Sequence, residues 1–301
     1  MNPMPERADV MMSVEQALDL VRPGMTIALG GFINSGHPML IVRGLIRRGV
    51  GDLTVIGGAS AGLEIDLLVA AGLVRKVIGT YVGAEALAPI GPSFRAAAQA
   101  GRIVVSDMDE AHYYCGLRAA AQRVPFNPWR AGIGTSLPEI NPDLKVFRDP
   151  VRGELLIAVP AFEIDIAFLH CGYSDVFGNV RHVDHGFSDH ALWSAADRTI
   201  VQVEQVISNE EIRRQPHLTS LPGVDGVIRA PFGAHPFASA GFYLEDQEHI
   251  AAYVAAADAA AKTDRRAELD AYLQRFVRGP GDHVAYLEEI GLRALLALNE
   301  Y

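Results

Sequence analysis

Three acidic residues stand close together where a strand is expected to end and a helix to begin. Residues 103–105 form an apolar, β-branched run that predicts a buried parallel strand. Asp107, Asp109 and Glu110 follow it, and a helical pattern then extends from about residue 111 to 123. Because α/β sheets bind ligands at the carboxyl ends of their strands, a carboxylate there can act on a substrate. Capping of the helix N-terminus explains the two aspartates equally well.

Glu110 is the acidic residue whose neighbours most favour acid–base chemistry. Tyr113 and Tyr114 follow it in the predicted helix. Aromatic side chains can exclude water from a carboxylate and raise its pKa, which suits a general base or a nucleophile. For Tyr113 itself we expect a solvated or interface position. The sequence therefore predicts Glu110 as a candidate base, with a role in capping the helix as the alternative.

Two glycine-rich loops follow predicted strands. Residues 25–29 form a strand that ends at Gly30 and Gly31, and residues 53–56 form another that ends in the loop 57–62. Consecutive glycines let the backbone approach a ligand closely, and their N–H groups can converge on an oxyanion. A tight turn between strand and helix is the alternative. The spacing matches neither the dinucleotide-binding pattern nor the P-loop pattern.

Arg130 lies between prolines and the glycine turn of residues 132–136, which contains Gly134. A guanidinium held in such a loop can bind a carboxylate or a phosphate. Pairing with Glu139 is the alternative for Arg130.

A histidine-rich segment follows in the second half of the chain. His182, His185 and His190 lie near Asp184 and Asp189, but the segment lacks the helical histidine pair and third ligand of a strong metal motif. We expect a polar loop there and no metal site.

Strands and helices alternate along the chain at short intervals. Beyond the elements above, the pattern predicts strands at residues 74–82, 155–159, 164–170 and 199–203, and alanine-rich helices from about residue 247 to 301. This alternation predicts an open, mostly parallel α/β sheet with helices on both faces. We expect one domain over residues 1–301, with a loose terminus at residues 1–12 and a helical C-terminal extension.

Composition excludes several classes of function. The formal net charge of −10 argues against a nucleic-acid partner, which requires a basic face. No apolar run reaches the roughly 18 residues that a membrane helix needs. The N-terminal residues lack the apolar core of a signal peptide. The two cysteines, Cys115 and Cys171, form no metal-binding motif and fit a reducing, cytoplasmic location as small core residues.

Several segments, in order, resemble a known family. They are GMTIALGGF (24–32), DLTVIGGASAG (52–62), VQVEQVISNEEIRR (201–214), VDGVIRAPFGAHP (224–236) and DHVAYL (282–287). Over nearly its whole length the chain resembles the A subunit of glutaconate CoA-transferase and its relatives among the two-subunit CoA-transferases.

This resemblance implies a NagB/CoA-transferase-like fold, a homologous B subunit that is an obligate partner, and an (αβ)2 assembly. It implies a coenzyme A thioester as substrate and no bound cofactor. In this family the nucleophilic glutamate usually lies on the B subunit, while the A subunit supplies loops around the acyl group. The candidate oxyanion and substrate loops contain Gly30, Gly31, Phe32, Asn34, Ser35, Gly58, Ala59, Arg130 and Gly134.

One segment departs from the transferase pattern. Residues 108–123 are more similar to the A subunit of the IpdAB-type hydrolases, which open a steroid ring with water. There, a glutamate matching Glu110 is the expected acid/base group. Three hypotheses therefore stand: a CoA-transferase subunit, a ring-opening CoA-ester hydrolase with Glu110 as base, and a non-catalytic scaffold that stabilises the B subunit. The residue at the nucleophile position of the B subunit would discriminate transfer from hydrolysis.

Overall fold

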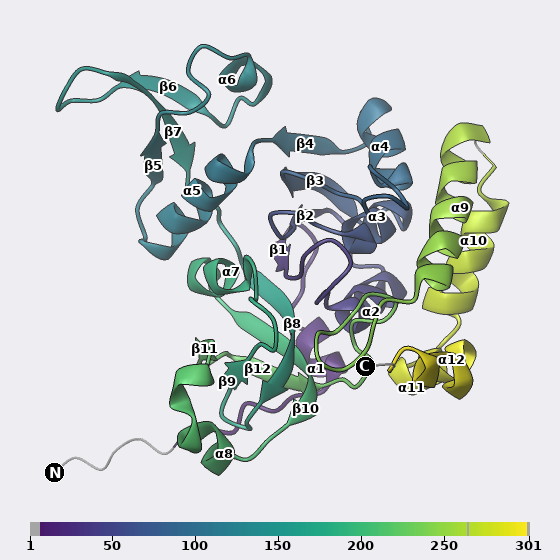
Figure 1. Cartoon of the computed structure of the whole chain (residues 1–301). Helices are drawn as coiled ribbons and strands as arrows, with labels where there is room; N and C mark the ends of the chain where they lie inside the picture. Colours follow the sequence, from purple (N-terminus) through teal and green to yellow (C-terminus); the bar gives the residue numbers. More distant parts are fainter. Residues whose placement is uncertain (1–6, 264, 300–301) are drawn as a thin grey trace, which may run out of the picture.

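A mostly parallel sheet forms the centre of the molecule (Figure 1). The computed structural model describes residues 7–263 and 265–299. The strands of this main sheet are β1 (Thr26–Leu29), β2 (Leu53–Ile56), β3 (Val74–Gly79), β4 (Val104–Asp107), β8 (Ile166–Ser174), β9 (Asn179–Arg181), β10 (Thr199–Val206), β11 (Leu221–Pro222) and β12 (Gly226–Arg229). Among these described strands, only β9 pairs antiparallel, with β8 and with β11. The predicted open, mostly parallel sheet is confirmed.

Strand β1 lies where the order of the sheet changes direction. The chain adds β2, β3 and β4 on one side of β1 and then returns to place β8 on its other side, followed by β10 and β12. Ile27 of β1 pairs with Val55 of β2 and with Ile166 of β8. The carboxyl ends of β1 and β8 therefore flank a topological switch point, which is where open α/β sheets form a crevice.

Helices cover both faces of the main sheet, as predicted. They include α1 (Val14–Leu18), α2 (Met39–Arg48), α3 (Leu63–Ala70), α4 (Pro92–Gln99), α5 (Glu110–Ala121) and α7 (Asp189–Ala195), whereas α8 (Asn209–Arg214) follows β10 at one end of the molecule (Figure 1). Side chains alternate along a strand, so Ile27 and Leu29 join one hydrophobic cluster with α1, α2 and α3. Ala28 joins a second cluster with α5 and α7 on the opposite face.

A second sheet stands apart from the first, beyond α5 (Figure 1). It consists of β5 (Phe126–Trp129), β6 (Lys145–Arg148) and β7 (Leu155–Pro160), paired antiparallel in the order β5-β7-β6. The short helix α6 (Leu137–Ile140) lies between β5 and β6 in the chain. The sequence correctly predicts a strand at residues 155–159, but it does not predict that this strand belongs to a separate sheet.

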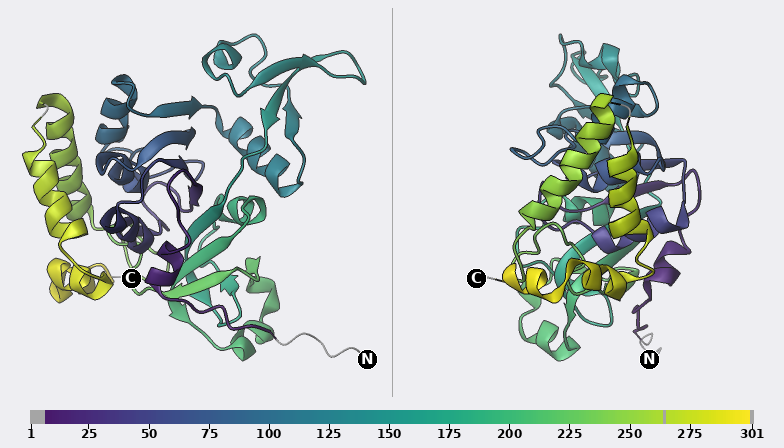
Figure 2. Two further views of the ribbon diagram at one scale, coloured as in Figure 1. Left: turned by 180° about the vertical axis from the view of Figure 1, so that it is seen from behind. Right: turned by 90° about the vertical axis from the view of Figure 1, so that its right-hand side faces the viewer.

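The C-terminal extension is helical, as predicted. It contains α9 (Gln247–Thr263), α10 (Ala267–Leu273), a π-helix (Gln274–Arg278), α11 (His283–Ile290) and α12 (Leu292–Ala297). Figure 2 shows α9 and α10 side by side, and α9 packs against α4. Among the helices of the described residues, none has the length and apolar composition of a membrane span. A 3-10 helix, Pro216–Leu218, precedes β11.

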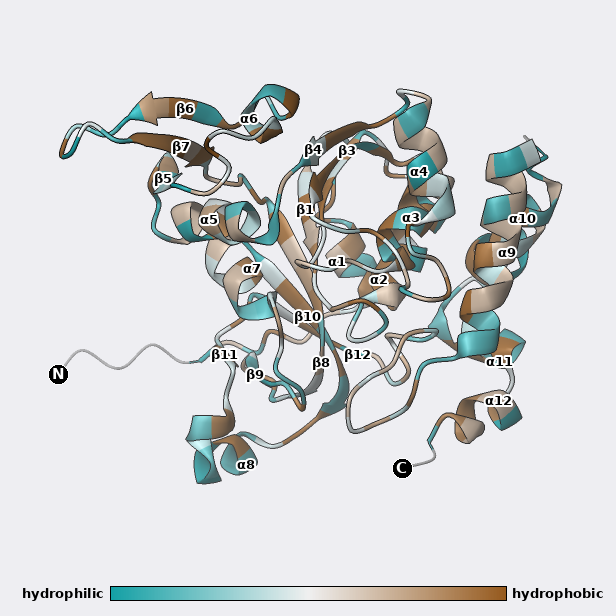
Figure 3. Ribbon diagram, turned by 45° about the horizontal axis from the view of Figure 1, so that its top comes forward, coloured by the Kyte–Doolittle hydropathy of each residue, from teal (hydrophilic) through white to brown (hydrophobic). Residues whose placement is uncertain are grey.

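Two predictions about local packing are wrong. Strand β4 lies at the edge of the sheet, and Val104 is 60% exposed, so the strand predicted from residues 103–105 is parallel but not buried. Figure 3 shows hydrophobic residues along β3, β4 and β7.

The terminus is not loose throughout residues 1–12, because Val10 and Met12 form backbone hydrogen bonds with Val227 of β12. Residues 1–6 of that segment lie outside the described residues.

Candidate active site

The two predicted glycine loops pack against each other at the carboxyl edge of the sheet. Ile33 donates its N–H to the Ser60 carbonyl over 2.8 Å. A Cβ at Gly58 would lie 2.3 Å from the Gly31 oxygen, and a Cβ at Gly62 would lie 2.3 Å from the Ile33 oxygen. Only glycine permits this approach, so the contact between the loops is itself a reason for these glycines.

The N–H groups predicted as oxyanion donors have acceptors within the chain. Gly30 donates to the Phe168 carbonyl over 2.9 Å, and Phe32 donates to the Ser35 carbonyl over 2.8 Å. Gly31 donates to Asp189 Oδ1 over 3.1 Å. These bonds fix the loop to β8 and to the start of α7. In this conformation the three donors therefore hold the loop in place and do not point together at a ligand.

A buried histidine and a buried glutamate lie beneath the loop. His37 Nδ1 is 3.2 Å from Glu64 Oε2, and both side chains are fully buried. The ring nitrogens of His37 also lie 3.0 Å from the Gly30 oxygen and 2.9 Å from the Ile33 oxygen. Burial lowers the pKa of His37 to about 4 and raises the pKa of Glu64 to about 8. This pair supports the loop from inside and is closed to solvent.

Tyr113 is buried, which corrects the expectation of a solvated or interface position. Its hydroxyl donates to the Gly57 carbonyl over 2.7 Å, and burial raises its pKa. The hydrogen bond joins α5 to the loop that follows β2. Tyr113 thus positions that loop.

Glu110 is the first residue of α5, and its side chain is exposed. The N-cap is Asp109, whose carboxylate accepts the His112 N–H over 2.9 Å, so Glu110 is not the N-cap residue. Its carboxylate still lies in the first turn, where a helix N-terminus favours an anion. The expected exclusion of water by Tyr113 and Tyr114 is also absent around Glu110. Its carboxylate is therefore open to a ligand or to a second protein.

Arg130 and Gly134 lie in the segment of the small sheet, after β5. Arg130 is 71% exposed and pairs with Glu154, so the predicted pairing with Glu139 is wrong. Gly134 is exposed in a left-handed conformation, with φ +81°. These two residues do not belong to the packed pair of glycine loops.

Asn34 and Ser35 line a surface hollow together with Glu85 and Gln247. Among the described residues, the buried Asn34 Oδ1 has no hydrogen-bond partner. Ala59 on the neighbouring loop donates its N–H to Ser188 Oγ over 3.4 Å. Phe32 stacks on Phe187, with ring centroids 4.2 Å apart. The hollow provides polar groups that can bind part of a substrate.

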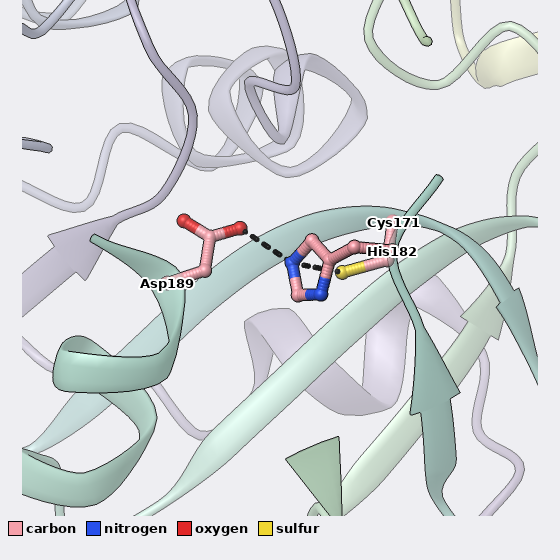
Figure 4. Close-up of side chains that lie close together, drawn as sticks. All are labelled: Cys171, His182 and Asp189. Atoms are coloured by element: carbon pink, nitrogen blue, oxygen red, sulfur yellow. Dashed lines mark hydrogen bonds and ion pairs between the residues drawn. The ribbon is translucent and has the colours of Figure 1, made fainter. Parts of the chain in front are cut away.

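A buried cluster that the sequence does not predict adjoins the first loop (Figure 4). Cys171 lies on β8, His182 follows β9, and Asp189 begins α7. His182 Nε2 is 3.2 Å from Cys171 Sγ and 3.1 Å from Asp189 Oδ2. Burial opposes a charge on His182, but Cys171 and Asp189 raise its pKa to about 11. The predicted polar loop does contain His182, whose side chain is only 6% exposed, but that prediction is wrong for Asp189, which is the first residue of α7.

Comparisons with known proteins identify relatives over most of the chain. An uncharacterised protein of Archaeoglobus fulgidus is 34% identical over 95% of this chain, which spans 63% of that protein's length. The cholesterol ring-cleaving hydrolase IpdA subunit of Rhodococcus jostii is 36% identical, with 81% of this chain and 86% of the relative covered. The A subunit of glutaconate CoA-transferase from Acidaminococcus fermentans is 32% identical, with 96% of this chain and 94% of the relative covered.

The fold agrees with these sequence matches. The crystal structure of glutaconate coenzyme A-transferase from Acidaminococcus fermentans superimposes with a TM-score of 0.89, covering 97% of this chain and 96% of that one, at 31% identity. A sequence model described as Coenzyme A transferase matches residues 11–228, which include both glycine loops and the cluster at Cys171. The chain therefore belongs to the coenzyme A transferase family.

Proposed function

We propose that this chain is the A subunit of a heteromeric CoA-transferase that moves coenzyme A between carboxylic acids. The observation that carries this proposal is the agreement with glutaconate coenzyme A-transferase, at a TM-score of 0.89 over 97% of the chain. The substrate is an acyl-CoA thioester, and the protein needs no bound cofactor.

In the proposed reaction a glutamate carboxylate attacks the thioester carbonyl, and the CoA thiolate leaves. The thiolate then attacks the glutamyl carbonyl of the resulting anhydride, which releases the free acid and leaves a glutamyl–CoA thioester. An acceptor carboxylate reverses these steps and receives the CoA. Such covalent catalysis divides one difficult transfer into easier steps.

We place the nucleophilic glutamate on a homologous B subunit. Several carboxylates of this chain near the site are buried in structural contacts: Glu64 faces His37, and Glu204 accepts the Tyr243 hydroxyl over 2.6 Å. Such groups cannot reach a thioester without unfolding their surroundings. The support for this placement is therefore the family resemblance, and these two buried carboxylates are already engaged within this chain.

This chain would supply one wall of a site shared between two different subunits. Asn34 and Ser35 line the surface hollow, and the glycine loops form a fixed backbone edge next to it. We propose that this edge orients the acyl-CoA against the carboxylate of the B subunit, in an (αβ)2 assembly. Both cysteines are free and buried, which fits the cytoplasmic location that we propose.

A ring-opening hydrolase is the second candidate, and Glu110 favours it. Its carboxylate is exposed at the start of α5, where it can take a proton from water or from a substrate. The 36% identity to the IpdA subunit of Rhodococcus jostii also supports this candidate. In that reaction water, and not a carboxylate, would receive the acyl group.

The two candidates differ in acceptor and in the site of the covalent adduct. The chain should be purified together with its B subunit, then given acyl-CoA with or without acetate as acceptor carboxylate. Transfer predicts acetyl-CoA formation and a CoA adduct that mass spectrometry maps to the B subunit. Ring-opening hydrolysis predicts that a cyclic ketone CoA ester gains one water without acetate, keeps its thioester and forms no such adduct, which would overturn the proposal.

A further inference from the structure

We propose that Cys171, His182 and Asp189 form a binding site for a divalent transition metal of the zinc type. Cys171 Sγ, His182 Nε2 and a carboxylate oxygen of Asp189 all lie within 4.8 Å of one another. Figure 4 shows the three side chains converging from three separate elements of the chain. Thiolate, imidazole and carboxylate are the ligand types that zinc uses in proteins.

The spacing of the donor atoms is close to that of a zinc site. Tetrahedral bonds of zinc to sulfur, nitrogen and oxygen place neighbouring ligand atoms about 3.3–3.6 Å apart. The observed separations from His182 Nε2 are 3.2 Å to Cys171 Sγ and 3.1 Å to Asp189 Oδ2. Outward shifts of a few tenths of an ångström would bring these two separations into that range, and the third pair of donor atoms, Cys171 Sγ and the Asp189 carboxylate, lies within 4.8 Å.

The outer contacts of the cluster already orient the ligands. His182 Nδ1 lies 2.6 Å from Ser220 Oγ, and this hydroxyl donates to the Val180 carbonyl over 3.1 Å. Ser220 Oγ must therefore accept a hydrogen bond from Nδ1, which leaves Nε2 for the metal. Asp189 Oδ1 accepts the Gly31 N–H, which leaves Oδ2 for the metal. Metal-binding histidines and carboxylates have such second partners in most known sites.

A small cavity next to the cluster provides a fourth position. Its volume is about 10 Å³, and its lining includes Cys171, His182, His170, Gly36 and Ser239. This is roughly the space of one water molecule, and the polar side chains can bind it. Three protein ligands and a water complete a tetrahedral site.

Metal binding would leave the net charge of the buried cluster unchanged. The divalent ion would displace one proton from the Cys171 thiol and one from the His182 ring to solvent. Two protons, each with one positive charge, then leave the cluster as the two positive charges of the ion arrive. The site also connects to the first glycine loop through the bond from Gly31 to Asp189, so the ion would brace that loop.

Cobalt(II) is the probe for this site, because cobalt bound to thiolate absorbs in the near-ultraviolet. The full-length chain, treated with a chelator and dialysed, should bind one Co²⁺ and develop a thiolate charge-transfer band. Zinc should displace the cobalt. X-ray absorption of the zinc form should show one sulfur at about 2.3 Å and nitrogen or oxygen at about 2.0–2.2 Å.

Matched variants assign the signal to the cluster. Cys171→Ala should abolish the band, whereas Cys115→Ala, which removes the other buried cysteine, should keep it. Asp189→Asn keeps an oxygen for the Gly31 N–H and should weaken cobalt binding at least tenfold. If Cys171→Ala does not fold, the sulfur count in the wild-type chain decides. A sulfur-free zinc shell, or a band that survives Cys171→Ala, would show that the cluster is only an ion pair beside a thiol.

Discussion

At the scale of single residues, close contacts explain the glycines of the site. Gly31 has φ +100°, and a Cβ there would lie 2.8 Å from backbone atoms of Gly36. Gly49, the C-cap of α2, also has a left-handed backbone, but a Cβ there would have open space. Substitutions at Gly31 and Gly49 therefore separate two costs: that of backbone strain, which both share, and that of the contact between an added Cβ and Gly36, which only Gly31 has.

We expect Gly31→Ala to destabilise the fold by about 2–5 kcal/mol, because backbone strain and the collision of the added Cβ both contribute at this position. Gly49→Ala should cost only about 1–2 kcal/mol, from strain alone. Urea unfolding of both variants measures the two costs. Equal losses in the two variants would contradict the packing of the loops described above.

Glu110 separates the two candidate reactions. For the proposed transferase, Glu110→Gln should change kcat less than about tenfold, since the nucleophile lies on the B subunit. For a hydrolase with Glu110 as base, kcat should fall by a factor on the order of 10²–10⁴. Steady-state assays of the two-subunit complex measure this, with the exposed Glu139→Gln as matched control. In either case the Asp109 cap remains, so stability should change by less than about 1 kcal/mol.

At the scale of elements, two buried side chains hold helices in position around the site. Asp66 of α3 accepts the Phe94 N–H of α4 and the Tyr253 hydroxyl of α9, each over 2.6 Å. Tyr113 of α5 donates to the Gly57 carbonyl after β2. Asp66 therefore joins α3, α4 and α9 on one face of the sheet. Tyr113 connects α5, on the other face, to the loop after β2.

Asp66 should make stability depend on pH. Burial raises its pKa to about 6, above the usual 3.8. The folded chain therefore retains this proton more strongly than the unfolded chain, so the stabilisation is complete below pH 4 and is lost as the pH rises through 6. The loss is on the order of 3 kcal/mol. Between pH 4 and 7, unfolding free energies of the wild type should fall relative to those of Asp66→Asn. Parallel curves would contradict this assignment.

Tyr113→Phe should destabilise the fold by about 1 kcal/mol, because the Gly57 carbonyl loses its buried donor. Tyr114→Phe removes a hydroxyl from a half-buried neighbour and should have a smaller effect. Thermal unfolding of the two variants provides the comparison. A larger loss in Tyr114→Phe would mean that Tyr113 does not anchor the loop.

At the scale of the whole molecule, the proposed function requires a second chain. We expect this chain alone to have no more than trace CoA-transfer activity and to gain full activity when mixed with a separately purified B subunit. Light scattering of the mixture should give the mass of an (αβ)2 assembly. Full turnover by the isolated chain would contradict the shared site.

The prediction of one domain over residues 1–301 stays a prediction; its basis is that α5 contacts both α7 and the small sheet.

The sequence by itself determined the alternation of strands and helices, because that pattern depends on local periodicity and on caps such as Ser13, whose capping box begins α1. The glycine loops and the resemblance of their motifs to a known family could also be predicted, because both depend on residues that are close together in the sequence. The second sheet could not be predicted, because β5 contains Pro128 and pairs with β7, a strand about thirty residues later in the chain. A proline is tolerated in β5 because this strand lies at the edge of its sheet. Only the tertiary structure brought Cys171, His182 and Asp189 together. Their side chains meet because β9 pairs with β8 and because α7, which begins at Asp189, packs back against β8.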